Sequence, residues 1–78
     1  MTKHHQTYQS PYAAMLTPDR FDLALKLATQ YHLDASQIMF AYLEITANVA
    51  EPGKGVTDRQ KEIDQRFQAF LDDAAKPL

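Results

Sequence analysis

Residues 35–50 constrain the fold more than any other stretch, because this segment is apolar on almost all sides. Read as a helix, it places its polar side chains on one thin strip, formed by Gln37, Glu44, Asn48 and Glu51. A helix with this pattern is buried on almost all sides. Either the rest of the chain must therefore cover it, or a second chain must.

Helix starts are marked by four capping patterns. They are Ser10–Pro11, Thr17–Pro18, Asp34 with Gln37, and Thr57 with Gln60. The first two place a hydroxyl residue before a proline, as at an N-cap followed by the first helical position. The other two have the spacing of capping boxes, although Ser36 could replace Asp34 as the cap. The segment Glu51–Gly55 contains one proline and two glycines and ends the preceding helix.

These signals predict an all-α fold. We expect a small three-helix bundle with helices at about 18–32, 35–50 and 58–75, preceded by a short N-terminal helical turn at about 11–16. The alternation typical of strands is absent. A length of 78 residues allows one domain. We place it at residues 10–76, after a flexible N-terminal tail at residues 1–9.

The outer helices differ in how much apolar surface they offer to the middle one. In the last helix the apolar positions form one narrow stripe: Ile63, Phe67, Phe70, Leu71 and Ala74. In the first long helix, between Phe21 and Tyr31, apolar side chains cover more than half the circumference. Asp22, Lys26 and Thr29 lie on the solvent-exposed side. Two such neighbours cover about half of the middle helix.

Two sources could cover the remainder. The N-terminal turn could fold back and place Tyr12, Met15 and Leu16 on the middle helix. Alternatively, a second copy of the chain could pack there, and the two covers are compatible. We expect a homodimer through the middle helix, and an unknown protein partner is the other possibility. The candidate interaction face consists of Met39, Phe40, Tyr42, Leu43 and Thr46.

Residues for catalysis or metal binding do not form a recognisable pattern. Cysteine is absent, which excludes disulfides and thiolate metal sites. His4 and His5 are adjacent in the tail, and His32 lies at the end of a helix, so no pair has metal-ligand spacing. Asp72 and Asp73 are neighbours and point to different sides of a helix. We expect no enzyme, no catalytic residues, no metal and no cofactor.

A ligand pocket is a third possibility. Tyr31, Phe40 and Tyr42 could line a cavity between helices. Aromatic residues at helical spacing more often belong to an ordinary core.

Residues 31–45 resemble the turn and second helix of a helix-turn-helix. Such a second helix reads bases while flanking Lys and Arg hold phosphates. Residues 35–51 contain no Lys or Arg and carry Glu44 and Glu51, and the chain's net charge is −2. We therefore do not expect nucleic acid as a partner. The sequence favours a self-associating protein-interaction or regulatory module, with a helix-turn-helix-like DNA-binding or transcription-regulating protein as the alternative.

The longest uncharged stretch after the tail, residues 35–43, is far shorter than the roughly 20 apolar residues that span a bilayer. The first residues lack the apolar core of a signal peptide. We expect no membrane association and a cytoplasmic location.

Overall fold

The structure is a computed structural model that describes residues 8–49 and 55–75. It contains a 3₁₀ helix, η1 (Ala13–Leu16), and three α-helices, α1 (Arg20–Tyr31), α2 (Ala35–Asn48) and α3 (Val56–Ala74). The described residues include no strand, so the predicted all-α, three-helix fold with an N-terminal turn is confirmed.

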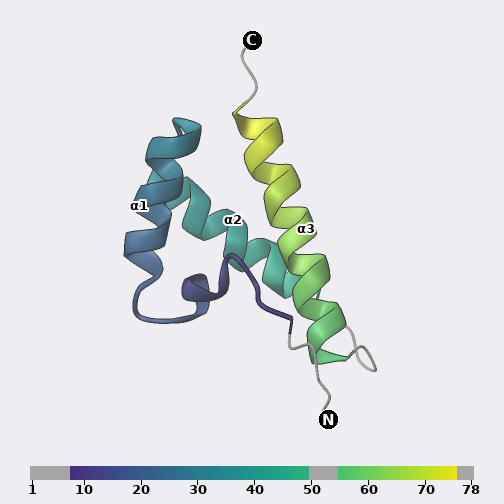
Figure 1. The fold of residues 1–78 in the computed structure, drawn as a ribbon. Coiled ribbons are helices and arrows are strands. Elements are labelled where there is room, and N and C mark those ends of the chain that lie inside the picture. The colour runs from purple at the N-terminus through teal and green to yellow at the C-terminus, as the bar shows by residue number, and fades with distance from the viewer. Residues whose placement is uncertain (1–7, 50–54, 76–78) are drawn as a thin grey trace.

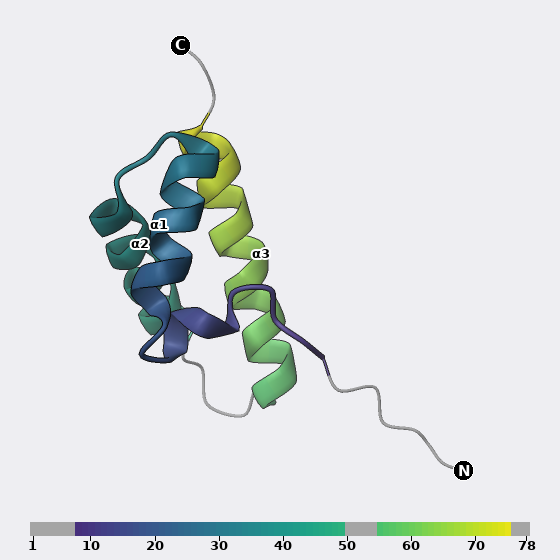
Figure 2. The same ribbon diagram turned by 60° about the vertical axis from the view of Figure 1, so that its left-hand side comes forward.

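The middle helix is central to the packing. α1 and α3 each pack against α2 and contact each other less. In Figure 1, α2 runs obliquely behind the other two helices, from α1 towards the first half of α3. η1 lies across the opening between α1 and α3, and residues 8–12 run on along α3 (Figures 1 and 2). The N-terminal segment thus covers the opening between α1 and α3, and Tyr12 and Met15 join the core there.

The two proline-containing helix starts differ from the prediction, because the N-caps are Tyr12 for η1 and Asp19 for α1, and the hydroxyls of Ser10 and Thr17 make turn hydrogen bonds before them. The Tyr12 amide donates to Ser10 Oγ at 3.1 Å, so Ser10 stabilises the turn that leads into η1. Thr17 Oγ1 accepts from the Asp19 amide at 3.1 Å and donates to the Ala14 carbonyl at 2.8 Å. The Thr17 hydroxyl is therefore shared between the end of η1 and the turn before α1, and α1 begins at Arg20.

The two predicted capping boxes are wrong. Asp34 occupies the N-cap position of α2, but its side chain makes no capping hydrogen bond. α3 begins at Val56 after Gly55, which places Thr57 inside the helix. The Gln60 amide instead donates to Asp64 and Tyr42 inside the protein. Most of the predicted breaker Glu51–Gly55 lies outside the described residues, as do Ala50, the tail histidines His4 and His5, and the expected end of the domain at residue 76.

His32 ends α1 in the left-handed conformation, with φ 59° and ψ 47°. The Leu33 amide donates to the Ala28 carbonyl at 3.0 Å, which closes the end of the helix. Glycine is the usual residue at such a position, because a Cβ atom makes this backbone conformation less favourable by about 1 kcal/mol. α2 starts at Ala35, three residues after His32, so the connection between α1 and α2 is short.

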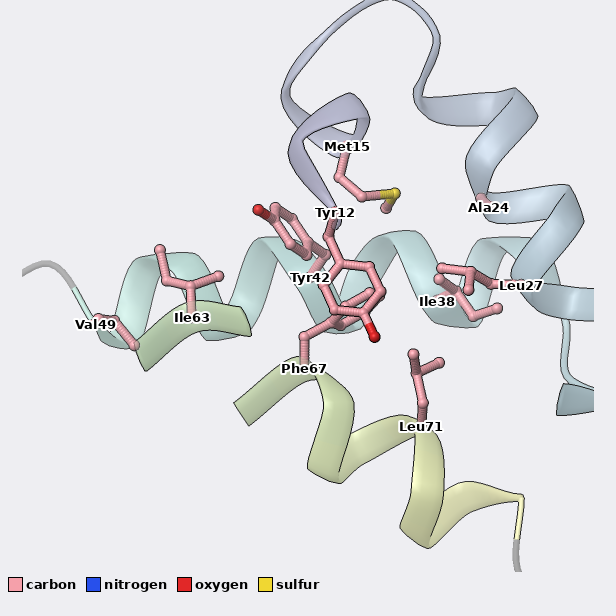
Figure 3. Packing of buried hydrophobic residues seen from close by; sticks show 10 residues of the cluster. All are labelled: Tyr12, Met15, Ala24, Leu27, Ile38, Tyr42, Val49, Ile63, Phe67 and Leu71. Atoms are coloured by element: carbon pink, nitrogen blue, oxygen red, sulfur yellow. The ribbon is translucent and has the colours of Figure 1, made fainter. Parts of the chain in front are cut away.

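The core is a cluster of apolar side chains from all four elements, shown in Figure 3. At its centre, the Phe67 ring contacts Tyr12 and Tyr42 edge-to-face, with ring centroids 4.7 and 5.0 Å apart. The remaining buried members are Met15, Ala24, Leu27, Ile38, Val49, Ile63 and Leu71. The predicted fold-back of the N-terminal turn is thus confirmed for Tyr12 and Met15, whereas Leu16 stays exposed.

The stripe predicted for α3 packs against the core, with Ile63, Phe67 and Leu71 buried and Phe70 partly buried. The apolar surface of α1 is only partly used, since Phe21 and Leu25 remain exposed. Over the described residues, the helices are too short or too polar to cross a membrane.

Candidate functional site

The surface of α2 that faces away from the core carries a largely exposed stripe of apolar and small residues, which we call the outer face. It consists of Ser36, Met39, Phe40, Leu43 and Ala47. Phe40 is 71% exposed and Leu43 is 63% exposed, one helical turn apart. Single exposed apolar residues are common, whereas Phe40 and Leu43 adjoin one another and together form an exposed apolar patch on α2. The expectation that α2 is covered on almost all sides is therefore not met within one chain.

A shallow groove borders this face. Its lining residues are Met15 from η1, Arg20 from α1, and Met39, Tyr42 and Leu43 from α2, and its volume is about 50 Å³. The Arg20 guanidinium group is anchored through Nε, which donates to the Thr17 carbonyl at 3.1 Å. One edge of the apolar stripe thus carries a positive charge.

Only part of the predicted interaction face is exposed on the single chain. Phe40 and Leu43 are exposed, and Met39 is half-buried at the groove. Tyr42 does not belong to an accessible face: it is 1% exposed, and its ring packs on Phe67. Thr46 is half-buried, and its Oγ1 atom is buried without a hydrogen-bond partner among the described residues.

The predicted ligand pocket between aromatic residues does not form. Tyr31, Phe40 and Tyr42 have different surroundings. The Tyr42 ring packs on Phe67 in the core, Phe40 is exposed, and the Tyr31 hydroxyl accepts from Gln68 of α3 at 3.1 Å. The apolar groove at Met39 and Leu43 is therefore a shallow surface feature and not a cavity enclosed by aromatic rings.

The opposite edge of the outer face is polar and acidic. Gln37, Glu44 and Asn48 are exposed there, and α2 contains no Lys or Arg. Glu51, the last member of the predicted strip, lies outside the described residues. The outer face thus lies between a cationic edge at Arg20 and an anionic edge at Glu44.

A second polar cluster, absent from the sequence-based expectations, surrounds Asp64 of α3. This acidic residue is only 5% exposed. Its carboxylate accepts from Ser10 Oγ at 2.9 Å, from Gln60 Nε2 at 3.0 Å and from the Tyr8 hydroxyl. Buried carboxylates are tolerated when hydrogen bonds replace their lost hydration. Of the predicted flexible tail, Tyr8 at least is therefore held against α3.

A neighbouring cluster ties the N-terminal turn to the second half of α3. The Tyr12 hydroxyl donates to Gln68, and the Gln68 amide donates to Tyr31 and to Asp72. The bond to Asp64 raises the pKa of Tyr8 to about 12. Burial raises the pKa of Tyr12 and of Tyr42 above the ordinary value for tyrosine. All three phenols are therefore neutral hydrogen-bonding groups at physiological pH, and their arrangement fixes residues 8–12 in place.

Metal-ligating residues are not gathered anywhere in residues 8–49 and 55–75, where no three His, Asp or Glu side chains could hold an ion. His32 is exposed at the end of α1. Comparison with protein-family models, with curated proteins and with solved structures finds no match. The functional assignment must therefore come from the surface itself.

Proposed function

We propose that this protein is a self-associating interaction module, which forms a homodimer through the outer face of α2. The observation that carries the proposal is the exposure of Phe40 and Leu43 on a helix whose other side is firmly packed. Burying one such side chain contributes about 1.5–3 kcal/mol. In a two-fold dimer the same face is buried on both copies, so each contact occurs twice.

A regulatory role and a cytoplasmic location belong to the same proposal. The fraction of such a domain that is dimeric rises with its concentration, so a second protein that recognises only the dimer would respond to that concentration. Cell fractionation with detection of the chain would test the location. A heterologous protein on the outer face is the competing occupant, and the size of the purified chain separates the two.

The decisive variant is Leu43→Glu, with Leu25→Glu as the matched control. Both leucines are exposed on helices, at 63% and 59%, but only Leu43 lies on the outer face. We expect Leu43→Glu to convert the dimer into a helical monomer, because a carboxylate is costly to bury without a partner. Leu25→Glu should leave the dimer intact. Light scattering gives the mass, and far-ultraviolet circular dichroism shows that the helices remain.

Equal masses for the two variants and the unmodified chain would contradict this proposal. Loss of helical signal in Leu43→Glu alone would show that Leu43 stabilises the single chain, and the outer face would lose its role as an interface.

The alternative, a helix-turn-helix DNA-binding protein, is favoured by one observation, the short connection between α1 and α2. The exposed start of α2 offers Ser36 and Gln37 to bases, but Glu44 follows and the helix has no cation to hold phosphates. An electrophoretic shift with random duplex DNA at low salt tests it, because nonspecific binding is strongest there. A retarded band would favour this alternative.

A further inference from the structure

We infer that the two α2 helices pair in parallel, so that Arg20 of each copy lies beside the partner's Glu44. This orientation rests on the proposed self-association and adds to it the register of the pair and a specificity-determining charge contact. The spacing of the outer face and its pre-formed helix support the pairing, and the opposite charges of its two edges determine the orientation.

The spacing of the outer face matches a two-stranded coiled-coil seam. Ser36, Phe40, Leu43 and Ala47 follow one another at intervals of four, three and four residues. This alternation keeps a stripe facing a second helix over two heptads. The large residues occupy the middle of the stripe and the small ones its ends, so two such helices can approach closely while Phe40 and Leu43 fill the centre.

The edges of the stripe carry opposite charges. Arg20 lies on one side, where it lines the groove with Met39 and Leu43. Glu44 lies on the other side and is exposed. Among the described residues, neither side chain has an ion-pair partner in the same chain. Both charges are available to a second chain.

Two-fold symmetry decides which edges meet. When two identical helices pair in parallel, the cationic edge of each copy lies against the anionic edge of the other. When they pair antiparallel, like edges meet. Because Arg20 lies beside Met39 and Leu43, near the middle of α2, it is then close to the partner's Arg20. Opposite charges across an interface favour the correct orientation and like charges disfavour the wrong one. The charges of this face therefore select the parallel pair.

The helix need not form on binding, because α2 is already held by the core through Ile38, Tyr42 and Val49. An isolated helix of this length would be marginal in water. Presenting a rigid stripe removes the entropy cost of ordering it at the moment of association. Two heptads of seam are then enough to pair two pre-formed faces.

Single-cysteine variants test the orientation directly, because the chain has no natural cysteine. In the parallel pair Ser36 lies opposite the partner's Ser36, so Ser36→Cys should form a disulfide-linked dimer on mild oxidation, and Ala47→Cys should do the same. In an antiparallel pair the two Ser36 positions are separated by about 16 Å, too far for a disulfide. Cross-linking would then require an equal mixture of the two variants.

Charge reversal tests the contact between Arg20 and Glu44. Arg20→Glu and Glu44→Arg should each weaken the dimer by about tenfold in dissociation constant, since a symmetric dimer contains the contact twice. The double variant should recover most of the affinity, because it restores opposite charges. Lys26→Glu is the control, since Lys26 is an exposed cation of α1 on its predicted solvent-exposed side. It should not change the dissociation constant.

The outcomes separate orientation from self-association. If Leu43→Glu dissociates the dimer but only the mixture of cysteine variants cross-links, the parallel pairing is overturned and the interface stands. The parallel pairing is also overturned if the double variant, with Arg20→Glu and Glu44→Arg, dimerises more weakly than either single variant. If the unmodified chain stays monomeric, both the interface and its orientation are overturned.

Discussion

The two sides of α2 are built from the same kinds of residue but differ in what covers them. Towards the core, Ile38, Tyr42 and Val49 are buried by α1, α3 and the N-terminal turn. On the outer face, Phe40 and Leu43 face solvent. An apolar composition therefore indicates that a helix needs cover. It does not indicate whether the cover comes from its own chain or from another.

The largest difference should appear between deleting Phe67 of α3, whose ring packs against the inner side of α2, and deleting Phe40 on the outer face. Phe67→Ala removes the ring that packs on Tyr12 and Tyr42, and should lower the free energy of unfolding by about 3–5 kcal/mol. Phe40→Ala should change the stability of the monomer by less than about 0.5 kcal/mol. Urea unfolding at protein concentrations below the dimer range measures both. Similar losses for the two variants would show that Phe40 is part of the core.

Alkaline pH should destabilise the fold, because tyrosines that pack or hydrogen-bond around the core would have to ionise. The pKa of Tyr8 is raised to about 12, and the pKa values of Tyr12 and Tyr42 are raised by burial. Above the unfolded pKa of about 10, the unfolded chain therefore binds fewer protons than the folded chain. The stabilisation by these phenols is complete below that pH and is lost as the pH rises towards 12.

Phenolate absorbance and helical circular dichroism, followed together, check this expectation. The tyrosines should ionise late and in step with the loss of helical signal. In Tyr8→Phe, the dependence of stability on pH should be less steep. Ionisation of all tyrosines near their ordinary pKa, with the helices unchanged, would contradict the hydrogen-bonded arrangement.

A smaller effect is expected at the polar cluster that holds the N-terminal segment over the core. Asp64→Ala leaves Ser10, Gln60 and Tyr8 without their common acceptor and should cost about 1–3 kcal/mol. Asp73→Ala, at an exposed position on the same helix, should change stability by less than about 0.5 kcal/mol. Urea unfolding compares them, and hydrogen exchange should show residues 8–12 losing protection only in Asp64→Ala. Equal stabilities would mean that Asp64 does not hold the segment.

Much of this fold follows from periodicity and turn chemistry in the sequence. The stripe of Ile63, Phe67 and Leu71 could be predicted because a 3.6-residue period directly specifies which face is buried. The capping boxes could not, because spacing does not show what else competes for a side chain. Gln60 has the correct spacing from Thr57, yet it donates to Asp64 and Tyr42.

The candidate site was less accessible to prediction. Asp64 has the sequence context of an ordinary surface residue, and its partners Tyr8 and Ser10 lie more than 50 residues away in the chain. On α2, the sequence shows an excess of apolar residues. The division into inner Tyr42 and outer Phe40 depends on how α1 and α3 dock. The angles at which α1 and α3 cross α2 are set by tertiary packing, and helix periodicity alone does not determine them.

The most direct measurement is sedimentation equilibrium of the unmodified chain over a concentration series. If the outer face binds a second copy, the average mass should rise with concentration from that of one chain, 8.9 kDa, towards twice that value. Leu43→Glu should stay at the mass of one chain throughout the series. A single-chain mass for the unmodified protein up to high micromolar concentration would contradict the account.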